Sequence, residues 1–153
     1  MMQRTLSFGL CLILLASLSI QAQPAKPAVQ RLEPVAETKL IMNGFLEPNF
    51  SGLGTRLKDR PADDETWTIV RGQSLLVAEG GNLLLMRPPK TRAAQDAWMA
   101  KAAELRDAGV KLANAAARKD YVAARAGAAM LANACNRCHE STGVKNRVEP
   151  FSP

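Results

Sequence analysis

A five-residue stretch close to the C-terminus constrains this chain more than any other feature: Cys135-Asn136-Arg137-Cys138-His139. The pattern C-x-x-C-H is the signature for covalent attachment of a c-type haem. Two thiols at this spacing can bond to the two vinyl groups on one porphyrin edge, and the next residue can bring an imidazole to the iron. Because positions i, i+3 and i+4 share one helix face, Cys135, Cys138 and His139 are predicted to hold one haem c per chain. His139 is the expected proximal iron ligand.

A Cys-x-x-Cys pair has other uses. A closed zinc site needs about four ligands, but His139 is the only histidine, and the third cysteine, Cys11, lies in the N-terminal segment. A thioredoxin-like dithiol expects strands and helices in alternation around it, whereas the residues around Cys135 are rich in alanine and helical in pattern. A disulfide or redox pair stays open as the alternative to haem attachment.

The N-terminus has the pattern of a secretory signal peptide. Arg4 precedes an almost wholly apolar run over residues 6–20, and Ala22 offers a small residue for cleavage. The run is about 15 residues long, shorter than the roughly 20 that span a bilayer. We therefore expect residues 1–22 to be a cleaved signal peptide, in contact with a membrane only during export, and the mature protein to be periplasmic in a bacterium. Export agrees with the haem motif, because bacteria attach c-type haem outside the cytoplasm.

The remainder of the chain is predicted to be all-α, without a convincing strand pattern. Residues 23–33 contain two prolines among alanine and lysine, which is typical of a disordered leader. A first helix is expected from near Pro34 to about Lys58, with a kink or break at Pro48. Three further helices follow from the apolar periodicity and the turn residues: 63–86 with an Asp63 or Asp64 cap, 91–118, and 121–141 with an Asp120 cap.

Four helices joined by short turns predict an antiparallel four-helix bundle with haem in its core, over residues 34–143. A C-terminal tail, residues 144–153, completes the chain. Gly80-Gly81 inside the second helix costs about 1 kcal/mol per glycine, so this pair indicates a kink or the close approach of another backbone or of the haem. Arg137 is expected to face solvent.

A haem motif on the last of four helices, in an exported chain, resembles the class II c-type cytochromes, the cytochrome c′ family. The resemblance covers residues 34–139 and implies haem in the bundle core, with a residue of the first helix over its distal face. In the low-spin branch of that family the distal residue is a methionine that binds the iron. Met42, followed six residues later by Pro48, looks like this branch, so Met42 is the candidate sixth ligand.

Other distal residues stay open. Methionine on an apolar helix face is usually core filler, and Met86, Met99 and Met130 compete with Met42. In five-coordinate members of the family the distal residue is apolar, and Phe45 or Leu46 would then take that place.

The partners of the haem propionates are also open. The family often has an arginine at the position of Val35, so Lys39 or Arg31 would have to substitute for it. After the motif, Lys145 and Arg147 are the nearest basic residues.

The resemblance implies an electron carrier rather than an enzyme, docking transiently on redox partner proteins. A five-coordinate cytochrome c′ that binds nitric oxide or carbon monoxide is the alternative. A peroxidase-like activity usually needs a distal histidine or polar group, and the one histidine is already assigned to the proximal side. The 20 Lys and Arg residues outnumber the 14 Asp and Glu, but they are scattered and few aromatics accompany them, so no nucleic-acid partner is expected. The family also allows for a homodimer through the first two helices.

Overall fold

The computed structural model describes residues 32–151. The predicted signal peptide and nearly all of the predicted leader lie outside this range. The described part is helical and contains no strand, which confirms the all-α prediction. No helix within it has the length and apolar character needed to cross a membrane. Its elements are α1 (Thr38–Ile41), the π-helical turn η1 (Met42–Leu46), α2 (Glu47–Arg56), α3 (Asp64–Leu85), α4 (Arg92–Ala117) and α5 (Tyr121–Ser141).

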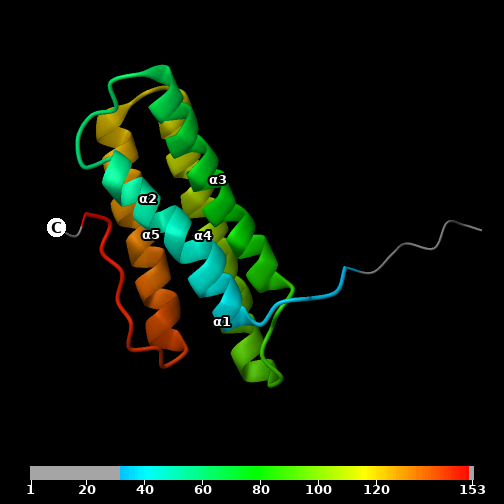
Figure 1. Ribbon diagram of the computed structural model, residues 1–153. Helices are drawn as coiled ribbons and strands as arrows, with labels where there is room; N and C mark the ends of the chain where they lie inside the picture. Colours follow the sequence, from blue (N-terminus) through cyan, green and yellow to red (C-terminus); the bar gives the residue numbers. More distant parts are fainter. Residues whose placement is uncertain (1–31, 152–153) are drawn as a thin grey trace, which may run out of the picture. The chain divides into compact units, whose positions relative to one another are not determined.

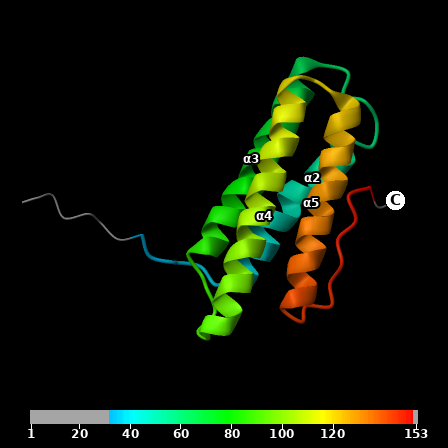
Figure 2. The same cartoon turned by 180° about the vertical axis from the view of Figure 1, so that it is seen from behind.

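The helices form a bundle in which each rod runs opposite to the one before it. α1, η1 and α2 follow one another without a gap and act as the first rod, and α3, α4 and α5 are the other three (Figure 1). Seen from behind, α4 lies between α3 and α5 (Figure 2). The closest packing is between α3 and α4, and then between α4 and α5.

The first rod differs from its prediction at two places, its start and Pro48. It begins at Thr38, four residues after Pro34, and Val35 is 98% exposed rather than part of an apolar face. Of the predicted kink or break at Pro48, a break does not occur, because α2 continues through Pro48 to Arg56. A π-helical turn precedes the proline, with the Glu47 N–H bonded to the Met42 carbonyl five residues back. Such a widened turn lets backbone carbonyls beside a proline, which has no N–H, form hydrogen bonds with other residues of the helix.

Glycines bring the backbones of α3 and α4 together. A Cβ on Gly109 of α4 would lie 2.8 Å from the Ser74 carbonyl oxygen, and one on Gly81 of α3 would lie 2.8 Å from the Ala102 carbonyl oxygen. A Cβ on the neighbouring Gly80 would clash with Leu46 of η1. The close approach predicted for Gly80-Gly81 is thus confirmed, and α3 runs through the pair without interruption.

Two aspartates cap helices as predicted. Asp63 accepts the Thr66 N–H at 2.6 Å, and Asp120 accepts the Ala123 N–H at 3.0 Å. These bonds satisfy N–H groups that have no partner inside the helix. The Thr66 N–H also holds the pKa of Asp63 below its usual value.

The end of α5 reverses the chain. Gly143 has a φ of +73°, its N–H bonds the Glu140 carbonyl, and the Val144 N–H bonds the His139 carbonyl at 2.9 Å. This pair of bonds is the Schellman arrangement, which favours glycine at the left-handed position. Residues 144–151 consequently run back along α5 as an ordered segment (Figure 1).

Candidate functional site

The first rod and α5 meet at one end of the bundle and diverge toward the other. At the closed end Arg125 of α5 donates to the carbonyl oxygens of Leu57 and Lys58, at 3.0 and 2.6 Å. From there the two rods separate in both views (Figure 1 and Figure 2). A cavity of about 560 Å³ lies at the open end, beside His139. Pockets that take cofactors are usually about 300–1,000 Å³.

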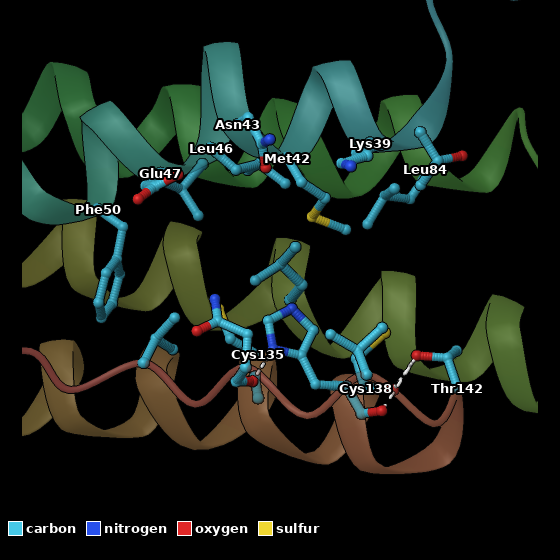
Figure 3. A pocket seen from close by; sticks show the side chains of 18 of the residues that line it. Lys39, Met42, Asn43, Leu46, Glu47, Phe50, Leu84, Cys135, Cys138 and Thr142 are labelled. Atoms are coloured by element: carbon cyan, nitrogen blue, oxygen red, sulfur yellow. Dashed lines mark hydrogen bonds between the residues drawn. The ribbon is translucent and has the colours of Figure 1, made fainter.

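The cavity has chemically different walls. α5 contributes Cys135, Cys138 and His139, and η1 contributes Met42 and Leu46. Figure 3 shows Met42 projecting from the first rod into the cavity, toward the helix that carries the two cysteines. The remaining walls are mostly apolar and come from α3, α4 and the tail, among them Val77, Leu84, Trp98, Leu105 and Val148.

The structure brings the four candidate haem residues to one cavity and separates them from the competing methionines. Met86 and Met99 are not among the residues that line it, and Met130 lies on a groove between α4 and α5. Of the alternative distal residues, Leu46 lines the cavity and Phe45 does not.

The basic candidates divide in a similar way. Lys39 is the only lysine or arginine of residues 32–151 that lines the cavity. Arg147 pairs with Glu140 on the surface at 2.8 Å, Lys145 is exposed, and Arg31 lies outside the described residues.

Cys135 and Cys138 are not joined in a disulfide, and their environment suppresses ionisation of the thiols. Burial raises the pKa of Cys135 to about 12, and burial also raises the pKa of Cys138. A redox dithiol needs a lowered pKa, because the thiolate is the reactive form. This environment therefore disfavours a thioredoxin-like role for the pair.

The His139 ring is held by the tail. Its Nδ1 lies 2.7 Å from the carbonyl oxygen of Asn146. A carbonyl can only accept, so Nδ1 must carry the proton and donate it. In the neutral ring this tautomer leaves the lone pair on Nε2, as a metal-binding histidine requires.

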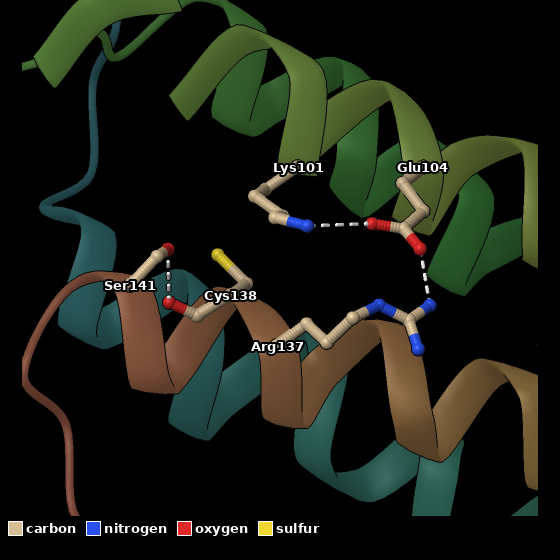
Figure 4. Close-up of polar contacts among 5 residues, drawn as sticks. All are labelled: Lys101, Glu104, Arg137, Cys138 and Ser141. Carbon is tan, nitrogen blue, oxygen red and sulfur yellow. Dashed lines mark hydrogen bonds and ion pairs between the residues drawn. The ribbon is translucent and has the colours of Figure 1, made fainter. Parts of the chain in front are cut away.

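The two residues between the cysteines tie α5 to different neighbours. Asn136 is only 6% exposed and exchanges two hydrogen bonds with the backbone of Val148: its Nδ2 donates at 3.0 Å and its Oδ1 accepts at 2.9 Å. Arg137 is exposed, as predicted, and it also pairs with Glu104 of α4 (Figure 4). Lys101 also pairs with Glu104, at 3.2 Å.

Further hydrogen bonds lie near the end of α5 and between two residues that line the cavity, Trp98 and Leu84. The pKa of Glu104 is lowered, chiefly by its hydrogen bond from Arg137. The Ser141 hydroxyl donates to the Cys138 carbonyl at 2.8 Å (Figure 4). On the opposite side Trp98 donates its Nε1 proton to the Leu84 carbonyl at 2.8 Å. The same carbonyl also accepts the Arg87 N–H at 2.9 Å, so Trp98 adds a second donor where α3 ends.

The roles of Asn136 and Asn146 were not predicted from the sequence. Asn136 occupies a variable position of the motif, and Asn146 acts through its backbone carbonyl, which every residue has. The one available signal was Gly143, whose position just after the helix is typical of a chain reversal. That reversal brings residues 144–148 beside the motif.

Comparison with protein-family models, with curated proteins and with solved structures finds no match to this chain. Within residues 32–151, no three or more His, Cys, Asp or Glu side chains form a group that could hold a metal ion.

Proposed function

We propose that this chain is an exported mono-haem c-type cytochrome that carries electrons through an iron ligated by His139 and Met42. One observation carries the proposal: the C-x-x-C-H residues and Met42 face a single, mostly apolar cavity from opposite sides. The proposal places the protein among the class II c-type cytochromes, because the motif is on the last helix of an all-helical bundle.

The residues at the cavity fit a haem in size and in chemistry. The volume of about 560 Å³ and the apolar walls suit a large flat aromatic group. Two thiols and an imidazole stand on one wall, and a thioether stands on the other. Lys39 supplies a cation for a haem carboxylate, the role that the family often gives to an arginine.

Each residue then has a defined task. Cys135 and Cys138 would hold a haem through thioether bonds to its two vinyl groups. His139, through Nε2, and Met42, through its sulfur, would be the two protein ligands of the iron. A haem held by this ligand pair supplies one-electron exchange between ferric and ferrous iron, at a potential raised by the methionine. Leu84, Leu105 and the other apolar walls keep water from the ring.

Electron transfer of this kind needs docking but no substrate pocket. We propose redox proteins in the periplasm as the partners, met through a small and transient interface. A homodimer through the first rod and α3 is compatible with this role.

Gas binding is the second candidate function. Leu46 is buried and lines the cavity beside Met42. If the Met42 sulfur leaves the iron free, an apolar distal wall of this kind favours small uncharged molecules such as nitric oxide or carbon monoxide.

The absorption spectrum of the purified haem protein separates the two functions. Wild-type protein, Met42→Ala and the control Met130→Ala should be secreted from cells that carry a c-type haem attachment system. We expect sharp α and β bands in the reduced wild type and in Met130→Ala, and a high-spin spectrum that changes with carbon monoxide in Met42→Ala. A high-spin wild type would contradict the electron-carrier proposal and favour gas binding.

A further inference from the structure

We infer that the C-terminal tail, residues 144–151, positions the iron-binding imidazole, and that Asn136 is the residue that locks it there. This inference rests on the proposed haem site, and it assigns Asn136 the part of a positioning residue.

The first step is the contact between tail and ring. The Gly143 turn reverses the chain directly after the motif, so the tail passes the His139 side chain. There the Asn146 carbonyl accepts the proton of His139 Nδ1 at 2.7 Å. A hydrogen bond at the outer nitrogen of a metal-binding histidine fixes the ring orientation and raises the basicity of the ligand nitrogen.

The second step is the lock. Asn136 exchanges two hydrogen bonds with the N–H and the C=O of Val148, at 2.9 and 3.0 Å, and its side chain is buried. Val148 is two residues from Asn146, so fixing its backbone also fixes the position of the Asn146 carbonyl. Asn136 and His139 lie three residues apart on α5. α5 therefore carries both the His139 ring and Asn136, the residue that fixes the tail and with it the Asn146 carbonyl.

The third step is the anchorage of the far end. Gly54 of α2 has no side chain at the place where the Pro150 carbonyl approaches, and a Cβ there would clash with that oxygen. The Arg125 guanidinium lies over the Phe151 ring, with its central carbon 4.1 Å from the centre of that ring. The tail thus contacts both the first rod and α5, and it contributes Val144, Asn146 and Val148 to the cavity wall.

The test compares Asn136→Ala with Asn133→Ala, both as secreted haem proteins. Asn133 is exposed, lies on the same helix and lines the groove between α4 and α5, not the cavity, so it is a matched control. Three quantities are measured: deuterium exchange of the tail amides by mass spectrometry, exchange of the His139 ring N–H by NMR, and the reduction potential.

Loss of two hydrogen bonds should raise the exchange rates of the Val148 amide and of the His139 ring proton by about ten-fold or more. The potential should rise, because a less basic histidine stabilises ferric iron less. Asn133→Ala should match wild type in all three measurements. Faster amide exchange with an unchanged His139 proton and an unchanged potential would overturn the inference, since the tail would then be structural only.

A second variant covers the case in which Asn136→Ala does not fold. Asn136→Asp keeps the acceptor for the Val148 N–H and removes the donor to its carbonyl, so we expect intermediate exchange rates. Wild-type rates and a wild-type potential in Asn136→Asp would count against the lock. A wild-type protein that carries no haem would instead defeat the proposed function, which keeps the two failures distinct.

Discussion

The two halves of the bundle pack in opposite ways. Between α3 and α4, Gly81 and Gly109 let the backbones touch, with the position of a Cβ only 2.8 Å from a carbonyl oxygen. Between the first rod and α5, the rods separate and leave a cavity of about 560 Å³ lined by Cys135, His139 and Met42. The residues with distinctive chemistry therefore gather in the half where the backbones stay apart.

The two halves therefore have different roles in the fold. The packed half holds α4 close to both of its neighbours, since Leu112 also fits against Gly127 of α5. The open half is closed at one end by Arg125 and along one side by the tail, not by helix packing. Substitutions in the packed half should thus change the free energy of unfolding, whereas those in the open half should change the properties of the haem that we propose for the cavity.

The largest expected loss of stability comes from the packed half. Leu112 is fully buried, and Leu112→Ala should lower the free energy of unfolding by about 2–5 kcal/mol, because it removes buried methyl groups and leaves a void. The control is Val122→Ala at a site that is 78% exposed, where the change should stay within about 0.5 kcal/mol. Urea unfolding followed by circular dichroism measures both. Similar values for the two variants would contradict the packing described for α4.

The glycine contacts of α3 and α4 provide a finer test. Gly109→Ala should cost roughly 1–3 kcal/mol through overpacking against the backbone of α3, although alanine favours helix. Gly72→Ala on the open face of α3, where nothing lies within 4 Å, should instead gain up to about 1 kcal/mol. Opposite signs in thermal or urea unfolding are the expected result. A gain at both sites would mean that α3 and α4 do not touch at Gly109.

The smallest effect is expected at the Glu104–Arg137 pair. Both side chains are partly exposed, so the pair should contribute less than about 1 kcal/mol at neutral pH. Arg137 lowers the pKa of Glu104 from its ordinary 4.5. The contribution of the pair to the free energy of unfolding should be present above the ordinary pKa of 4.5. It should disappear as the pH falls through the lowered pKa that Glu104 has in the folded state.

Unfolding of wild type and Arg137→Gln between pH 7 and pH 3, at low salt, measures this contribution. The stability difference should shrink toward acid and also in added salt. A difference that grows toward acid would contradict the assigned pair.

Local sequence signals predicted most of the fold but only part of the site. The long helices follow from apolar periodicity, and Asp63 and Asp120 cap them because their carboxylates reach free N–H groups. The C-x-x-C-H spacing also places its three residues on one face of α5, and they line one cavity with Met42. These features depend on neighbours in sequence or on a fixed helical repeat.

What escaped prediction depends on contacts between distant residues. Whether Pro48 breaks a helix depends on how the backbone hydrogen bonds around it are completed. Here the π-helical turn η1 completes them. The late start at Thr38 leaves Arg87 to bond the Ala36 carbonyl at 3.0 Å, a contact between residues 51 apart. The Asn146 carbonyl leaves no mark in the sequence, because any residue at that position would supply it.

We propose that Cys135 and Cys138 bind haem covalently, and the intact mass of the protein can show whether they do. The chain and its Cys135→Ala/Cys138→Ala variant should be secreted from cells with a c-type haem attachment system, denatured in acid and weighed by mass spectrometry. We expect a wild-type mass greater than that of the mature polypeptide by one haem, and a variant with the mass of the polypeptide alone. A folded, helical wild type that weighs no more than its polypeptide would rule out covalent attachment of haem.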